Sequence, residues 1–156
     1  MNNKALVAYF TKSGASKQYA EVIAKTLTDN GFDVKTHNIA EDIPDVSSFD
    51  TVIVGTGVRM FRVYRPWKKI LKQKQLGDKQ FFIFLSSGTA IEDPDKAVEK
   101  YLHPLAKKYN LSPKSMISFP GIMPEKWAKI DKGKQTFKPE LAEKWAKKIA
   151  EQIKNK

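Results

Sequence analysis

A short polar segment near the start of the chain carries the side chains needed to bind a phosphate group. The segment TKSGASK, residues 11–17, lies between an apolar run and a stretch with helical spacing, and Gly14 lets its backbone turn tightly. Backbone amides at a helix start carry the positive end of the helix dipole, and nearby hydroxyls can donate to phosphate oxygens. The segment therefore predicts a cage for one terminal monophosphate. Its hydroxyls belong to Thr11, Ser13 and Ser16.

The same spacing argues against two other phosphate-binding motifs. A Walker A loop needs a second glycine followed by Lys-Ser/Thr, and the dinucleotide fingerprint needs three glycines, whereas this loop has one. The remaining alternative is an ordinary capping loop, with Ser13 or Ser16 as the helix cap. The position of segment 11–17 after a buried first strand favours phosphate binding over simple capping, because ligands of open α/β sheets bind beyond the carboxyl ends of the strands.

Strands and helices alternate along the chain. Continuous apolar runs such as residues 5–10 (ALVAYF) are typical of strands buried on both faces, and apolar residues at helical spacing predict amphipathic helices. This alternation implies an α/β fold with a parallel sheet between helices, in a single domain over residues 1–156. Only a weak or missing helix is expected between the second and third strands. The predicted strands are 5–10, 32–37, 51–55, 80–85 and 114–119, and the predicted helices are 16–29, 64–73, 93–109 and 139–154.

The first strand and its loop together resemble the flavodoxin signature. Residues 9–16 (YFTKSGAS), followed by Ala20 and Ile23, are similar to the Ser/Thr-x-Thr-Gly-x-Thr loop with which flavodoxins bind the phosphate of FMN. The resemblance extends over nearly the whole chain. It implies a flavodoxin-like three-layer sandwich with a five-stranded parallel sheet of order 2-1-3-4-5. It assigns the FMN phosphate to Thr11, Lys12, Ser13, Gly14, Ala15 and Ser16, with Ser16 in place of the usual threonine.

The resemblance also places the flavin ring between the loops after the third and fourth strands. In the first loop, Met60 or Phe61 would cover one ring face, or Phe61 would cap the core, and Gly57 would allow close backbone approach. The second loop has no aromatic residue, which would suit a flavin that reacts directly with a substrate. Its amides would bind the pyrimidine carbonyls of the flavin. The implied ring-binding residues are Thr56, Gly57, Val58, Arg59, Met60 and Phe61 in the first loop, and Ser86, Ser87, Gly88 and Thr89 in the second.

Residues 55–59 (GTGVR) are also similar to a flavodoxin-domain branch that includes the menaquinone-dependent protoporphyrinogen oxidases. Three arginines, at positions 59, 62 and 65, would then bind a carboxylate-bearing substrate or an acidic partner at the flavin edge; the alternative is a solvated loop. We assign no catalytic acid–base pair, because the redox chemistry would belong to the cofactor.

The chain is strongly basic, and its charge is uneven. The net charge is +11; residues 1–99 hold 14 basic and 12 acidic side chains, whereas residues 100–156 hold 14 and 5. Electron-carrying flavodoxins are typically acidic, so this chain departs from them. We expect an acidic redox partner protein, a small-molecule acceptor, or work at an anionic membrane surface, and we do not expect nucleic acid as a partner. The lysine-bearing segment 122–137 would be a docking surface or a variable loop.

Composition excludes several other classes of function. The chain has no cysteine, so disulfides, thiolate catalysis and iron–sulfur clusters are excluded. No apolar stretch approaches the roughly 20 residues that span a bilayer, and no targeting peptide is recognisable, so we expect a cytoplasmic protein. A response regulator is set aside because the third strand ends in Gly55-Thr56 without an aspartate.

Three functions remain after these exclusions. We favour an FMN-binding electron-transfer protein. The alternative within the same class is an FMN-dependent oxidase or reductase of the protoporphyrinogen oxidase or quinone reductase type. The alternative of another class is a basic flavodoxin-fold binding module without redox activity.

Overall fold

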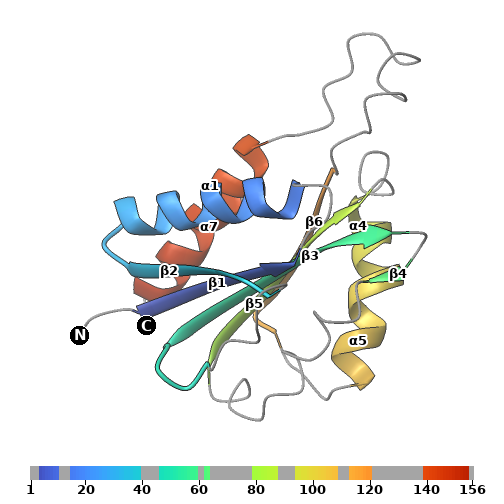
Figure 1. The fold of residues 1–156 in the computed structure, drawn as a ribbon, viewed down its shortest axis with the longest axis horizontal. Coiled ribbons are helices and arrows are strands. Elements are labelled where there is room, and N and C mark those ends of the chain that lie inside the picture. The colour runs from blue at the N-terminus through green and yellow to red at the C-terminus, as the bar shows by residue number, and fades with distance from the viewer. Residues whose placement is uncertain are drawn as a thin grey trace, which may run out of the picture.

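A parallel β-sheet runs through the middle of the molecule (Figure 1). The computed structural model describes residues 4–10, 15–39, 46–59, 62–63, 79–87, 94–108, 113–120 and 139–154. The five parallel strands follow the spatial order β2-β1-β3-β5-β6, which confirms the predicted α/β class and the predicted 2-1-3-4-5 order. These strands are β1 (Lys4–Phe10), β2 (Asp33–Asn38), β3 (Thr51–Arg59), β5 (Gln80–Ser87) and β6 (Ser115–Pro120); a short strand β4 (Arg62–Val63) pairs with β3.

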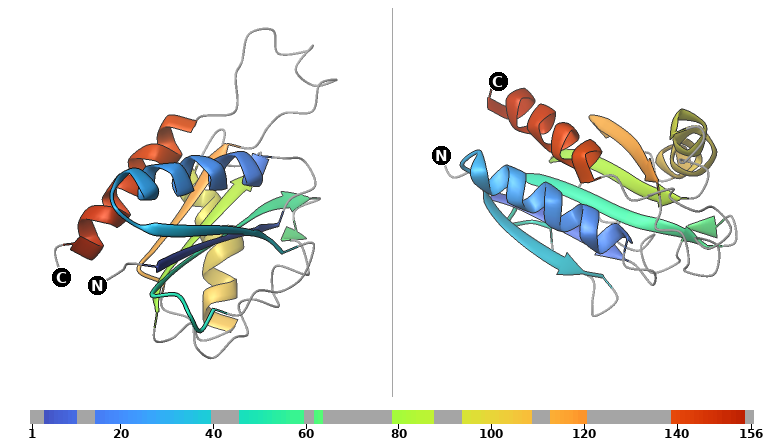
Figure 2. Two further views of the ribbon diagram at one scale, coloured as in Figure 1. Left: turned by 60° about the vertical axis from the view of Figure 1, so that its left-hand side comes forward. Right: turned by 90° about the horizontal axis from the view of Figure 1, so that it is seen from above.

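Helices cover both faces of the sheet and complete three layers (Figure 2). Helices α1 (Ala15–Asp29) and α7 (Pro139–Lys154) pack against each other on one face. The other face carries one helical stretch made of α4 (Pro94–Ala97), η2 (Val98–Leu102) and α5 (His103–Lys108). The predicted helices 16–29, 93–109 and 139–154 are therefore confirmed to within about one residue at each end. The predicted helix 64–73 lies outside the described residues.

Strand β1 shows why the apolar runs do not alternate with polar residues. Leu6, Ala8 and Phe10 belong to the core under α4–α5, whereas the intervening residues belong to the core under α1 and α7. Successive side chains of a strand point to opposite faces, so a strand covered on both sides needs apolar residues at every position. The intervening residues are Ala5, Val7 and Tyr9.

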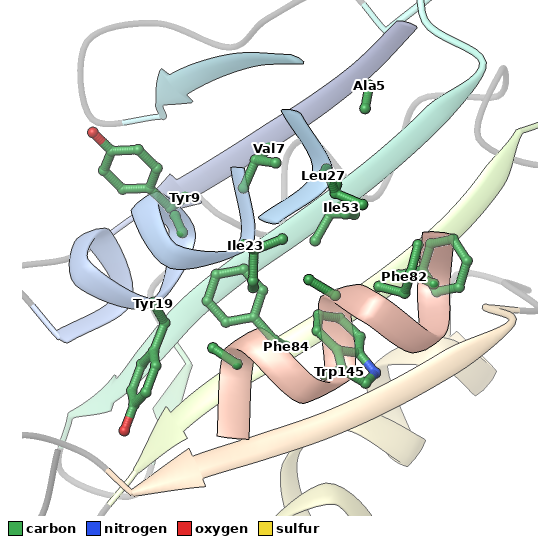
Figure 3. Close-up of a cluster of buried hydrophobic side chains, with 14 of the residues drawn as sticks. Ala5, Val7, Tyr9, Tyr19, Ile23, Leu27, Ile53, Phe82, Phe84 and Trp145 are labelled. Atoms are coloured by element: carbon green, nitrogen blue, oxygen red, sulfur yellow. The ribbon is translucent and has the colours of Figure 1, made fainter. Parts of the chain in front are cut away.

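The core under α1 and α7 is rich in aromatic rings (Figure 3). Trp145 of α7 lies at its centre, with its ring centroid 6.2 Å from Phe84 and 6.3 Å from Phe82, both on β5. Its indole N–H donates to Ser115 Oγ at 3.0 Å, so the buried nitrogen has a partner. Helix α1 contributes Tyr19, Ile23 and Leu27, which are spaced four residues apart and therefore lie on one helical face.

The helix that follows β5 widens for one turn. The backbone N–H of His103 donates to the carbonyl of Val98, five residues back, instead of the usual four. Pro104 follows directly; it has no N–H, and its ring would clash with the carbonyl four residues earlier in a regular α-helix. The π turn relieves this clash while Tyr101, Leu102 and Leu105 stay buried.

Candidate functional site

The carboxyl ends of three strands and the start of one helix meet at a single edge of the sheet (Figure 1). In the sheet register, Phe10 of β1 lies beside Thr56 of β3, and Gly57 of β3 lies beside Ser86 of β5. Helix α1 begins at Ala15, five residues after β1 ends. Connections after parallel strands emerge at this edge, and the described parts of the three predicted segments, residues 15–16, 56–59 and 86–87, lie together there.

Two of the predicted site residues form a direct hydrogen bond across this edge. Ser16 Oγ in the first turn of α1 lies 3.0 Å from Ser86 Oγ near the end of β5, and either hydroxyl can be the donor. Ser16 is 0% exposed and Ser86 is 3% exposed, so the pair is shielded from water. The bond joins positions 70 residues apart and fixes the start of α1 against β5.

The electrostatics at the start of α1 favour an external anion. The helix has 15 residues, and its first turn contains no acidic side chain. The helix dipole therefore leaves a positive end that no carboxylate of that turn neutralises. A phosphate ester is the kind of group that such a helix start binds, so the residues present fit the phosphate end of FMN.

Apart from Ala15, the first residue of α1, the remaining described residues of the site lie on strands. Thr56 is completely buried, and by strand alternation it shares the face of Val52 and Val54, under α4–α5. Gly57 occupies the α1 face beside Ser86. Val58 and Arg59 continue β3. Eight of the predicted cofactor-binding residues lie outside the described part of the chain: Thr11, Lys12, Ser13, Gly14, Met60, Phe61, Gly88 and Thr89.

The predicted strand ends at this edge are wrong. Strand β3 does not end at Gly55 but continues to Arg59, where it forms an antiparallel ladder with β4 in the register Val58–Val63 and Arg59–Arg62. Strand β5 likewise continues past Leu85 to Ser87. Pairing partners on neighbouring strands extend both elements, although glycines and serines in isolation favour turns. Residues 56–59 and 86–87 are therefore positioned by the sheet and not by loops.

The hydroxyl pair was not found by sequence reasoning, although both of its members were predicted site residues. The available signal was the polar residue Ser86 on the strand face that carries Phe82 and Phe84. A polar side chain in a buried row needs a polar partner, and only the fold shows that Ser16 is that partner.

Comparison with known families settles the class of the chain. The flavodoxin domain family matches residues 6–129, which is most of the 156-residue chain. The chain belongs to the flavodoxin domain family. No curated protein sequence matches this flavodoxin-domain chain. Among its described residues, no helix is both long enough and apolar enough to cross a membrane.

Solved structures share the fold of this flavodoxin-domain protein at low sequence identity. It is similar to flavodoxin 2 from Bacillus cereus, with 19% identity, a TM-score of 0.70, and coverage of 96% of this chain and 99% of that one. A flavodoxin from the domain Archaea gives 20% identity, a TM-score of 0.63, and coverage of 97% and 99%. Rubredoxin:oxygen oxidoreductase from Desulfovibrio gigas gives 17% identity, a TM-score of 0.68, and coverage of 99% of this chain but only 37% of that longer chain.

Proposed function

We propose that this flavodoxin-domain protein binds FMN at the edge formed by β1, β3, β5 and α1, and that it works in electron transfer. The observation that carries the proposal is the meeting of Ser16 and Ser86 at the start of α1, whose first turn has no acidic residue, near the carboxyl ends of the central strands. When bound there, FMN would supply transfer of one or two electrons. Family membership and the sheet order support the same assignment.

We propose that the three segments at this edge bind different parts of FMN. Residues 11–16 would bind the phosphate through hydroxyls and backbone amides at the positive end of α1. Residues 56–61 and, after the buried Ser86, residues 87–89 would flank the flavin ring. Gly57 and Ser86 lie side by side in the sheet, so these two segments start from adjacent, rigidly paired strands. The partner we propose is acidic or lies at an anionic surface, and the proposed location is cytoplasmic.

Binding of three flavins to the flavin-free protein tests the proposal. We expect FMN to bind at least roughly tenfold more tightly than riboflavin, because charge-assisted hydrogen bonds contribute about 1.5–3 kcal/mol each. The measurement is quenching of flavin fluorescence in titrations with FMN, riboflavin and FAD. Equal affinities for FMN and riboflavin would refute a phosphate site, and a colourless protein that takes up no flavin would favour the binding module without redox activity.

A pair of matched variants places the phosphate on the molecule. Ser13→Asp puts a negative charge in the proposed phosphate segment and should weaken FMN binding by roughly tenfold or more while leaving riboflavin binding largely unchanged. Ser47→Asp makes the same chemical change at an exposed serine before β3, at the opposite edge of the sheet, and should change neither affinity. Equal effects of the two variants would show that the general charge of the protein, and not this segment, controls FMN affinity.

A direct oxidoreductase is the second candidate, because residues 86–93 contain no aromatic side chain to cover the ring. Its test uses the FMN-loaded protein in both redox states under anaerobic conditions. The oxidised protein is offered a porphyrinogen-type electron donor, the reduced protein is offered quinone and protein acceptors in turn, and the flavin absorbance is followed. Rapid turnover with a small molecule would favour the enzyme, and reaction with a protein acceptor alone would favour the carrier.

A further inference from the structure

Ser86 interrupts a row of apolar side chains, and packing of the core alone does not explain a serine at that position. Phe82 and Phe84 precede it on the same face of β5, and both are completely buried under α1 and α7. Ser86 is 3% exposed, and its hydroxyl lies 3.0 Å from the hydroxyl of Ser16, which is 0% exposed. Buried hydroxyls need partners, and these two satisfy each other where water does not reach.

Binding of an anion would decide which of the two serine hydroxyls donates the hydrogen bond between them. A serine hydroxyl donates one hydrogen bond and accepts up to two, so in the free protein either oxygen can be the donor. A phosphate group that has lost its protons only accepts. If Ser16 donates to phosphate, its single proton is committed there, and the bond to Ser86 survives only when Ser86 donates to Ser16.

We propose that Ser86 is a positioning residue for the phosphate site, acting through Ser16. The inference rests on the proposed function, FMN binding at this edge. Ser86 donates to Ser16 Oγ and thereby holds the Ser16 hydroxyl with its proton directed away from β5, ready for an acceptor. Hydrogen bonds in series polarise one another, and burial strengthens them, so the effect of Ser86 reaches a ligand that it does not touch.

The decisive comparison is FMN against riboflavin, which differ by the phosphate alone. Ser86→Ala should lower FMN affinity by about three- to tenfold, the effect of one hydrogen bond, and should change riboflavin affinity by less than about twofold. Ser16→Ala should do the same, and the double variant should bind FMN no more weakly than Ser16→Ala, because Ser86 acts only through Ser16. Ser86→Thr, which keeps the hydroxyl, should restore most of the FMN preference.

Ser115→Ala is the matched control. Ser115 also takes part in a side-chain hydrogen bond of 3.0 Å, accepting from Trp145 in a partly buried position, but it lies at the amino end of β6, away from the site. Its loss should lower the melting temperature of the flavin-free protein and leave the FMN-to-riboflavin affinity ratio unchanged. Melting temperatures of all variants show whether Ser86→Ala folds; if it does not, Ser86→Cys, with its weaker donor, should give a smaller drop in that ratio.

The possible results separate this inference from the proposed function. An unchanged affinity ratio in Ser86→Ala or Ser86→Cys would overturn the positioning role, and so would equal losses for FMN and riboflavin, which would indicate a purely structural tie. Additive effects of the Ser16 and Ser86 substitutions would overturn it as well. In each of these cases a wild-type preference for FMN would leave the proposed function standing, whereas a wild-type protein without that preference would remove both.

Discussion

Replacing Gly55 by alanine would place a methyl group where the Phe84 ring now lies. Gly55 and Phe84 are register partners on β3 and β5, and a Cβ built on Gly55 would lie 1.9 Å from Phe84 Cζ and 2.2 Å from both Cε atoms. All three distances are far below a normal carbon–carbon contact. The ring itself is completely buried, with centroids 5.9 Å from Phe119 and 6.2 Å from Trp145, so it cannot swing aside without moving other core rings.

The magnitude follows from this packing. Overfilling a close-packed core costs about 1–3 kcal/mol, and the fixed backbone and the enclosed ring place Gly55→Ala near 3 kcal/mol. In a domain of this size about 1 kcal/mol shifts the melting temperature by ~2–4 °C, so we expect a drop of roughly 6–12 °C. Urea unfolding followed by far-ultraviolet circular dichroism measures the free energy, and thermal scans measure the temperature.

Two further variants test the cause and not only the size of the loss. Phe84→Leu replaces the ring that lies against Gly55 by a smaller side chain. The double variant Gly55→Ala/Phe84→Leu should therefore lose clearly less stability than the sum of the losses in the two single variants. Gly31→Ala is the control, because Gly31 has φ +91° and open space around its Cβ position; strain there should cost about 1 kcal/mol, and Phe84→Leu should not relieve it. A loss below about 1 kcal/mol for Gly55→Ala, or full additivity with Phe84→Leu, would refute the steric argument.

Two smaller predictions concern α7. Trp145→Phe removes the indole donor to Ser115 and part of a buried ring, so the free energy of unfolding should fall by about 1–2 kcal/mol, and adding Ser115→Ala should cost little more; an unchanged urea midpoint would contradict this. Glu143→Gln breaks an ion pair of 3.1 Å with Lys147, and the two side chains are 52% and 60% exposed. The free energy of unfolding should therefore change by less than about 0.5 kcal/mol, and a loss above about 1 kcal/mol would show that the pair is not a simple surface contact.

Local pattern and family resemblance were enough to predict most of the fold. Runs such as residues 5–10 predicted buried strands because each strand here is covered on both faces, and the alternation with helices fixed the parallel arrangement. The errors lie at strand ends. Residues 56–59 were expected in a loop, and only the pairing with β1, β4 and β5 makes them strand. The π turn before Pro104 was also missed, although the proline was a local signal.

The candidate site likewise has a part that the sequence predicted and a part that it did not. The hydroxyls of residues 11–16 stand out because their types and spacing are local features of the sequence. The link from Ser16 to Ser86 spans 70 positions, and no local pattern encodes it. It depends on the register that sets Ser86 beside Gly57 and on α1 lying over that part of the sheet. Contacts of this kind follow from tertiary packing, so they become visible only when the elements are assembled.

Core packing and the proposed site share one pair of strands. Gly55 and Phe84 are paired in the register, and Gly57 and Ser86 are paired two residues further on, on the same face. Any change that lifts Phe84 from Gly55 should therefore also displace Ser86 relative to Ser16, since a strand transmits such a shift over two residues. Variants at Gly55 consequently cannot separate stability from cofactor binding. Ser115 lies at the opposite end of the sheet and takes part in a hydrogen bond of the same length. Its substitution can therefore change stability without changing cofactor binding, and for this reason Ser115→Ala is the control in the site experiments.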